Sequence, residues 1–454
     1  MTIDVLLHEF FFWTVWLIIP LLIDLFTGFG SAIVVWRAYF RKKETELTFF
    51  PYVTILIPVY NSEKTLRDCL QSIVDQQYPL QNIQVILIDN GSEDESFEVF
   101  QQFQMEQPIL NIRYIKSTQG KAQALNQGIY LSRGRYILNI DSDGMLDAKA
   151  VYNTVRKFEK DVDIAAMTGV VMINSQFIQE NSKSLLKLLQ RCELFEYVEA
   201  FLVGRGYQSH RNSIFTLAGA FSAFRKEVLT KTQMYNIETL GEDTHMTTQI
   251  RLMYNGKVAL CEDAFFYVDP IESVDRLYMQ RQRWQRGGIE VTALFNPLLK
   301  KKMRGSLDVI RYTMIKDHTL IFSRMIWIFA LVYLMFLDYP LYLIVTANMI
   351  LYFAYVANSL LFYFVSKLYL KSQPKIKKYM RKHLYTVFLL PFYRMFVFFC
   401  RIAGTINAKE ERANWNTRTL SEEMQMISGR IKKQFSFYFK LKKWMNGGGD
   451  KVKL

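Results

Sequence analysis

The chain has 454 residues, half of them hydrophobic and 15% aromatic, and its formal net charge is +14. This length exceeds one typical domain, and the four scattered cysteines contain no CxxC pair, which argues against a disulfide framework or a zinc site. The positive charge suits an anionic membrane or a phosphorylated substrate; without a zinc-finger or RNP-like signature, no nucleic-acid partner is expected.

The first 45 residues are predicted to form a transmembrane anchor. Segment 10–36 is almost wholly apolar and exceeds the roughly 20 residues that a helix needs to cross a bilayer. It is too long for the core of a signal peptide. Arg37, Arg41, Lys42 and Lys43 follow it, whereas no Lys or Arg precedes it. The positive-inside rule therefore places the next domain in the cytoplasm.

Residues 46–300 are predicted to form an α/β domain. Apolar runs that predict strands alternate with amphipathic patterns that predict helices, the first of them capped by Ser62. The strands are 53–58, 85–89, 112–116, 136–140 and 258–268, and the helices are 62–74, 93–105, 122–133, 185–203, 241–252 and one carrying 280–284. This alternation indicates a largely parallel sheet. Ligands bind beyond the carboxyl ends of such strands, where Asp89 and Asp141 lie.

One short stretch, Asn139-Ile140-Asp141-Ser142-Asp143-Gly144, follows a predicted buried strand. Residues two apart on a strand share a face, so Asp141 and Asp143 are expected to point at one object. That object is interpreted as a divalent cation, since Mg²⁺ favours one or two carboxylates plus substrate phosphates. The structural alternative is a solvated turn.

The region 301–407 is predicted to return to the membrane. Segments 320–337 and 341–365 are apolar and joined by Asp338-Tyr339-Pro340, which predicts a transmembrane hairpin. Segment 384–402 is apolar but interrupted by Pro391 and Arg394. Because the tail 408–454 is basic and is expected in the cytoplasm, an interfacial or re-entrant helix is favoured over another span. The prediction is a multi-pass protein of the cell membrane.

The ordered set of motifs resembles the family 2 glycosyltransferases with the GT-A fold. The closest likeness is to the membrane-bound, processive synthases of hyaluronan, chitin, cellulose and poly-N-acetylglucosamine. The motifs are Ile57-Pro58-Val59-Tyr60-Asn61, Ile88-Asp89-Asn90-Gly91-Ser92, Gly120-Lys121-Ala122-Gln123-Ala124-Leu125-Asn126, Asp141-Ser142-Asp143, Gly241-Glu242-Asp243 and Gln280-Arg281-Gln282-Arg283-Trp284. The family usually has a second Asp at Asn90. Length and layout also resemble the glycosyltransferases that accompany exosortase G in Gram-positive bacteria.

This resemblance implies a Rossmann-like GT-A domain, mainly of parallel strands, inserted between transmembrane helices. It also implies a nucleotide-diphosphate sugar donor, normally a UDP-sugar, with Mg²⁺ or Mn²⁺. The implied metal ligands are Asp143 and Asp141, the donor-binding residues are Asp89, Lys121, Asp141, Gln280 and Arg283, the catalytic base is Asp243, and the acceptor-binding residues are Trp284 and Glu242. A single in-line displacement by the acceptor hydroxyl would invert the anomeric centre.

Each candidate also has a structural interpretation. Arg283 suits a solvated helix face, Asp243 the N-terminus of a helix, and Trp284 ordinary packing. The leading hypothesis is an inverting enzyme that extends a polysaccharide or glycolipid at the cytoplasmic face. The alternatives are a single addition to a lipid-linked acceptor and a catalytically inactive sugar-nucleotide sensor or scaffold. The expected partners are the donor, a polysaccharide or lipid-linked acceptor, membrane lipids and further subunits.

Overall fold

The computed structural model describes residues 25, 27–41, 46–178, 184–301, 325–326, 329–331, 333–337, 340–410, 418–426 and 428–429. Most of the predicted N-terminal span and of the basic tail, and part of the span 320–337, therefore lie outside the described residues. From the anchor segment, the structure describes α2 (Thr27–Arg41).

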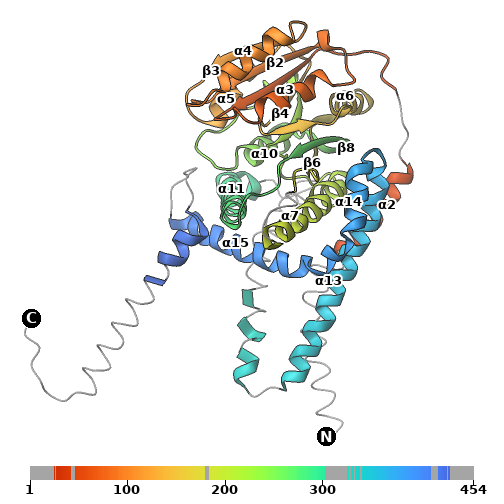
Figure 1. Ribbon diagram of the computed structural model, residues 1–454, viewed down its shortest axis with the longest axis vertical. Coiled ribbons are helices and arrows are strands. Elements are labelled where there is room, and N and C mark those ends of the chain that lie inside the picture. Colours follow the sequence, from red (N-terminus) through yellow and green to blue (C-terminus); the bar gives the residue numbers. More distant parts are fainter. Residues whose placement is uncertain are drawn as a thin grey trace, which may run out of the picture.

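The first half of the domain is an alternating parallel α/β unit, as predicted. Its strands are β1 (Val53–Val59), β2 (Ile83–Asp89), β3 (Asn111–Lys116) and β4 (Tyr136–Ile140), in the spatial order β3-β2-β1-β4. They are joined by α3 (Leu66–Val74), η2 (Leu80–Asn82), α4 (Ser96–Glu106) and α5 (Lys121–Leu131) (Figure 1). Every residue of β1, β2 and β4 is buried, because helices cover both faces of a parallel sheet.

The second half of the sheet is mixed, but two of its four strands keep the direction of the first four, so the expectation of a mainly parallel sheet holds for six of the eight strands. β7 (Phe221–Arg225) runs antiparallel to both β4 and β6 (Ile164–Ile173). β8 (Lys257–Val268) is parallel to β6, and the short β5 (Gly144–Leu146) closes the eight-stranded sheet antiparallel to β8. Sequence reasoning assigned no element to β5, β6 or α6 (Ala150–Lys160).

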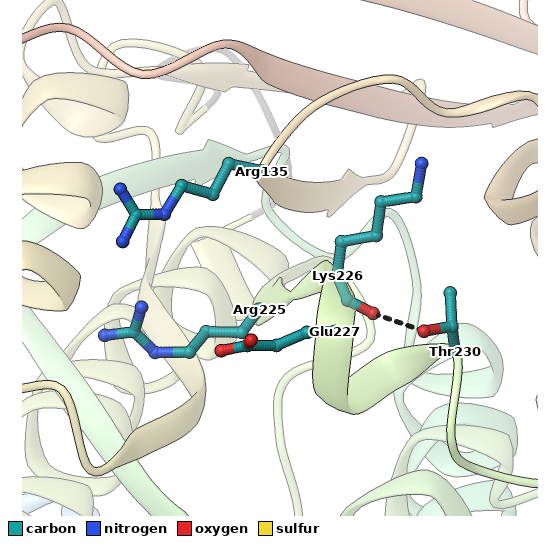
Figure 2. A pocket seen from close by; sticks show the side chains of 5 residues that line it. All are labelled: Arg135, Arg225, Lys226, Glu227 and Thr230. Carbon is teal, nitrogen blue, oxygen red and sulfur yellow. Dashed lines mark hydrogen bonds between the residues drawn. The ribbon is translucent and has the colours of Figure 1, made fainter.

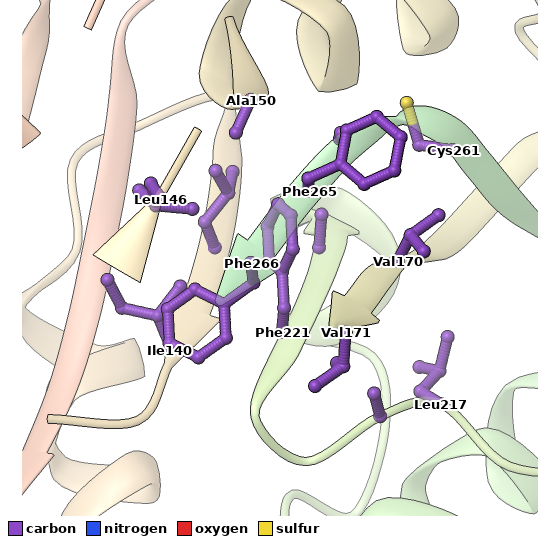
Figure 3. Packing of buried hydrophobic residues seen from close by; sticks show 14 of the residues in the cluster. Ile140, Leu146, Ala150, Val170, Val171, Leu217, Phe221, Cys261, Phe265 and Phe266 are labelled. Atoms are coloured by element: carbon purple, nitrogen blue, oxygen red, sulfur yellow. The ribbon is translucent and has the colours of Figure 1, made fainter. Parts of the chain in front are cut away.

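Aromatic side chains fill the core of this mixed half (Figure 3). Phe221 of β7 and Phe266 of β8 are fully buried. A Cβ on Gly169 would lie 2.0 Å from the Phe221 ring, and one on Gly144 would lie 2.4 Å from the Phe266 ring. Since cores are close-packed, these two glycines make room for the rings and let β5 and β6 join the sheet.

Helices extend below the sheet towards the apolar C-terminal region (Figure 1). The helix expected at 185–203 is divided into α7 (Ser184–Tyr197), the π-helix η3 (Val198–Gly204) and α8 (Arg205–His210). The other helices are α9 (Lys226–Leu229), α10 (Glu242–Tyr254), α11 (Val274–Lys301), α13 (Leu341–Tyr369), η4 (Leu370–Ser372), α14 (Pro374–Lys382), η5 (Leu384–Phe388) and α15 (Leu390–Glu410).

Two C-terminal helices differ in direction and exposure. Among the described residues, only the helix Leu341–Ser372 is long and apolar enough to cross a membrane, judged by length and composition. In Figure 1, α15 lies crosswise to α13, beneath α7 and α11. Its exposed apolar side chains recur at helical spacing, at Phe392, Met395, Phe399 and Ile406. Its other face is buried against the domain.

Candidate active site

The candidate site lies at the edge of the sheet where β2 and β4 end. Parallel pairing of β1 with both strands places their carboxyl ends side by side, so Asp89 and Asp141 share this edge, as predicted. Between Asp141 and Asp143, the buried Ser142 bonds through its hydroxyl to the Ser62 hydroxyl (2.7 Å). Ser62 was predicted to cap a helix. In the structure its side chain instead anchors this loop.

Asp89 is buried and fixes the turn that follows β2. Its Oδ1 accepts a hydrogen bond from the backbone N–H of Ser92 (2.8 Å). Burial of Tyr114 raises the pKa of that phenol, and the negative charge of Asp89 raises it further. Asn90, which departs from the family pattern, accepts the backbone N–H of Gly120 through its side-chain oxygen. An aspartate could accept the same bond. This contact ties the β2 turn to the start of α5, directly before Lys121.

Lys121 and Asp141 form an ion pair, which is less exposed than a surface pair. The side chains are 18% and 29% exposed, and Lys121 Nζ contacts Asp141 Oδ1. The same ammonium donates to the carbonyl oxygen of Gly219 (3.4 Å). Lys121 thus lies inside the predicted site.

Asp143 is accessible to solvent but lies in a crowded acidic crevice. Desolvation by surrounding protein atoms, followed by the negative charge of Asp141, raises the pKa of Asp143 to about 6. Within the described residues, no group of three or more His, Cys, Asp or Glu side chains is arranged to hold a metal ion. The Asp141/Asp143 pair fits a cation such as Mg²⁺, which takes further ligands from phosphates and water.

Glu242 and Asp243 open α10 and lie near enough to the ion pair for their charges to act on Lys121. Asp243 Oδ1 accepts the N–H (2.6 Å) and hydroxyl (3.3 Å) of Thr244. A Cβ on Gly219 would lie 3.5 Å from Asp243 Oδ2 and 3.6 Å from Lys121 Nζ, so both groups approach this backbone. The described residues place no hydrogen-bond donor on Oδ2. Burial, then the charge of Asp243, raises the pKa of Glu242 to about 7.

The helix α11 reaches this crevice through contact between two glycines. A Cβ on Gly241 would lie 2.8 Å from the carbonyl oxygen of Gly287, so the start of α10 touches α11 directly. Arg283 lies in the same crevice: burial lowers its pKa, and the charges of Glu242 and Asp141 oppose that shift. The structure therefore brings the predicted α11 motif to the predicted carboxylates.

Trp284 lies in an aromatic cluster that sequence reasoning missed. Its side chain is 47% exposed, and its ring meets Phe201 of η3 edge to face at 6.2 Å between centroids. Arg281, which pairs with Glu196 (2.6 Å), lies 4.3 Å from the Trp284 ring centroid. Gln280 donates to the hydroxyl of Tyr197 (3.5 Å). The contacts of Gln280 and Trp284 thus lie in this aromatic cluster.

Arg205 is a second residue that no sequence motif indicated. Its guanidinium donates to Thr168 Oγ1 (3.1 Å) and lies 4.8 Å from the centroid of the Phe201 ring. Burial lowers the pKa of Arg205 to about 10, and the charge of Asp243 opposes this shift. Arg205 and Lys121 are therefore two cations that act on Asp243. What marks Arg205 as a candidate site residue is structural: it directly follows a π-helix, and π-helical turns are common at functional sites.

Two pockets lie at opposite edges of the sheet. A small one of about 50 Å³ adjoins the candidate site and is lined by Gln119, Gly120, Lys121, Ala122, Gln123, Ile237, Thr239 and Glu242. A larger one of about 390 Å³ is lined by Arg135, Arg225, Lys226, Glu227 and Thr230 (Figure 2). It lies where β4 begins, because Tyr136 pairs with Arg225. Arg225 donates there to three backbone carbonyls and to the Tyr136 hydroxyl, which is a structural role.

Comparisons with known proteins point to one chemistry. Residues 54–232 match the family model described as Glycosyl transferase family 2. A poly-beta-1,6-N-acetyl-D-glucosamine synthase from Staphylococcus epidermidis is 27% identical over 315 residues, which cover 69% of this chain and 70% of the relative. A synthase of the same name from Staphylococcus aureus is 26% identical over 257 residues, covering 55% of this chain and 58% of the relative.

A similar fold is present in a solved structure. A mannosyltransferase from Pyrobaculum calidifontis, in complex with GDP-Man and Mn²⁺, superposes with a TM-score of 0.52 at 16% identity. The match covers 87% of this chain and 98% of the mannosyltransferase. The α/β fold with its mixed sheet is therefore GT-A-like.

Proposed function

We propose that this glycosyltransferase extends a polysaccharide from a UDP-sugar, with inversion at the anomeric centre. The match of residues 54–232 to the glycosyltransferase family 2 model and the similarity to a named polysaccharide synthase support this proposal. The observation that carries this proposal is the crevice around Gly219. There Asp243 Oδ2 and Lys121 Nζ approach the same backbone, and Lys121 is paired with Asp141.

The donor is proposed to lie across the carboxyl edge of β2 and β4. Its diphosphate would meet the ammonium of Lys121 and the guanidinium of Arg283, whose planar fork suits phosphate oxygens. Asp141 and Asp143 would hold Mg²⁺ or Mn²⁺, which when bound stabilises negative charge on the leaving diphosphate. The Mn²⁺ and nucleotide sugar named for the mannosyltransferase support this choice of cation and donor class.

Asp243 is proposed to accept the proton of the attacking hydroxyl. Thr244 fixes Oδ1, which leaves Oδ2 to face the crevice. Burial raises the pKa of Asp243, while the backbone N–H of Thr244 and the charges of Lys121 and Arg205 lower it. These groups favour the ionised form that a general base requires. One displacement by the hydroxyl then inverts the anomeric carbon.

The acceptor is proposed to enter beside Trp284, Phe201 and Glu242. An exposed indole offers a flat apolar face for a sugar ring, and the edge-to-face contact with Phe201 holds its orientation. Because the curated relatives are named as synthases of poly-beta-1,6-N-acetyl-D-glucosamine, UDP-N-acetylglucosamine is the first donor proposed.

The membrane is proposed to lie below the sheet, so that the domain faces the cytoplasm. α13 would cross the bilayer, and α15 would lie in its interface with Phe392, Met395 and Phe399 towards lipid. Arg394 of α15 pairs with Glu199 of η3, which ties this helix to the catalytic domain. The predicted spans 10–36 and 320–337 complete the proposed multi-pass layout.

The test is a donor screen with the purified chain in nanodiscs. UDP-N-acetylglucosamine, UDP-glucose, UDP-glucuronate and GDP-mannose are each supplied with Mn²⁺ or Mg²⁺, and nucleotide release and polymer length are measured. The proposal predicts release of UDP from one UDP-sugar and its loss on adding EDTA. Turnover of GDP-mannose alone would refute the UDP assignment, and full activity in EDTA would refute the role of the cation.

A further inference from the structure

We propose that Lys121 is a resident counterion that holds Asp141 while the donor is absent and must leave it before a divalent cation binds. This inference rests on the proposed function, since it takes Asp141 and Asp143 as the cation's ligands. Its consequence is that cation and donor bind together rather than independently.

The first observation is that the ammonium and a cation would compete for one oxygen. Lys121 Nζ contacts Asp141 Oδ1, and both side chains are largely removed from solvent. Mg²⁺, for example, binds a carboxylate oxygen at about 2.0–2.1 Å. An ammonium that touches the same oxygen would crowd that ion and repel it through a poorly screened medium.

The second observation is that Lys121 has other acceptors nearby. Its Nζ already donates to the Gly219 carbonyl (3.4 Å), and Asp243 Oδ2 approaches the same glycine. The lysine side chain is flexible and carries three donors, so it can leave Asp141 and keep polar contacts. A diphosphate in the crevice would provide a further anionic partner for the released ammonium.

Together these contacts give Lys121 two opposite effects. In the empty site it weakens cation binding by neutralising Asp141, whereas with the donor present it contacts phosphate and strengthens donor binding. The donor therefore frees Asp141 for the cation, and by linkage the cation raises the affinity for the donor by the same factor. Removing Lys121 should reduce this coupling in both directions.

The test is an Mn²⁺ titration followed by electron paramagnetic resonance, with the full chain in nanodiscs and no nucleotide. Lys121→Met should bind Mn²⁺ about tenfold more tightly than wild type, a change within the usual range of such couplings, and Lys121→Gln should do the same. Lys121→Arg keeps the charge and should resemble wild type. Lys149→Met, at an exposed position outside the site, is the matched control and should leave the affinity unchanged.

A second titration measures how far UDP tightens Mn²⁺ binding. Wild type should show strong tightening and Lys121→Met little. Unchanged or weaker Mn²⁺ binding in both Lys121→Met and Lys121→Gln, with binding still lost in Asp143→Asn, would overturn the role of Lys121 and leave the proposed function intact. Mn²⁺ binding that survives in Asp143→Asn would instead overturn the metal assignment on which both proposals rest.

Discussion

Replacing Glu423 tests whether the described C-terminal segment is docked on α11. Thr419 and Glu422 form a reciprocal helix cap. The Thr419 N–H donates to Glu422 Oε2 (2.8 Å), and the Glu422 N–H donates to Thr419 Oγ1 (3.2 Å). One turn on, the buried Glu423 carboxylate accepts Gln282 Nε2 (3.2 Å), Asn407 Nδ2 (2.5 Å) and the Tyr278 hydroxyl. The sequence analysis predicted a basic cytoplasmic tail for this region and did not identify Glu423.

The magnitude follows from the three donors that Glu423 satisfies. In Glu423→Ala all three lose this acceptor, and each unsatisfied donor costs about 1–3 kcal/mol when buried. The low end applies because Asn407 is only partly buried and Gln282 keeps its bond to the Tyr278 hydroxyl (2.8 Å). Taking the low end for each, docking weakens by about 3 kcal/mol, which is roughly a hundredfold in the opening equilibrium. Glu423→Gln keeps one carbonyl oxygen in place of Oε1 and should weaken docking by about 1 kcal/mol.

Hydrogen exchange by mass spectrometry on the chain in nanodiscs measures this opening. Amides of residues 420–426 should exchange about a hundredfold faster in Glu423→Ala and at most about tenfold faster in Glu423→Gln. Glu227→Ala, at an exposed site on the far edge of the sheet, is the control and should change nothing there. Equal exchange in Glu423→Ala and the control would refute the docking.

Three further outcomes are expected. Arg205→Met removes a charge that lowers the pKa of Asp243, so the acid limb of the pH profile of kcat/KM should move to higher pH. Arg205→Lys should partly restore the wild-type position, and an acid limb that does not move in Arg205→Met would contradict this. Burial raises the pKa of Glu193 from 4.5 to about 7, so the folded chain binds more protons than the unfolded chain between these values, and stability falls as pH rises through this window. Glu193→Gln should therefore stabilise the fold by up to about 3 kcal/mol at pH 8, seen as a higher Tm, and change Tm little at pH 4.5. A larger stabilisation at pH 4.5 than at pH 8 would contradict this. Spin labels at Phe392→Cys and Phe399→Cys in nanodiscs should collide with oxygen in lipid more than with a water-soluble nickel complex, and equal collision with both would contradict an interfacial α15.

The parallel half of the fold could be predicted because its signals are local. The run 136–140 is apolar and ends before Asp141, and β4 has the same bounds. By contrast, Phe221–Arg225 is a strand because it lies between β4 and β6. Its mixture of small and aromatic residues has no alternation that predicts a strand, so tertiary packing decides its structure.

The candidate site divides in the same way. Each predicted site residue belongs to a short motif. In the structure one ion pair and mutual electrostatic effects on pKa link six of them, namely Lys121, Asp141, Asp143, Glu242, Asp243 and Arg283. Phe201 and Arg205 belong to no such motif. They reach the site because a π-helix changes the register between α7 and α8, which no periodicity in the sequence indicates.

The assay of Asp243→Asn tests the central claim most directly. Donor binding, measured calorimetrically with Mn²⁺ and the active UDP-sugar, should stay close to wild type, because Asp243 is proposed to act on the acceptor. Sugar transfer should fall by about 10²–10⁴-fold, the usual contribution of a general base. A variant that binds donor normally and transfers sugar within about tenfold of the wild-type rate would contradict the assignment of Asp243 as the base.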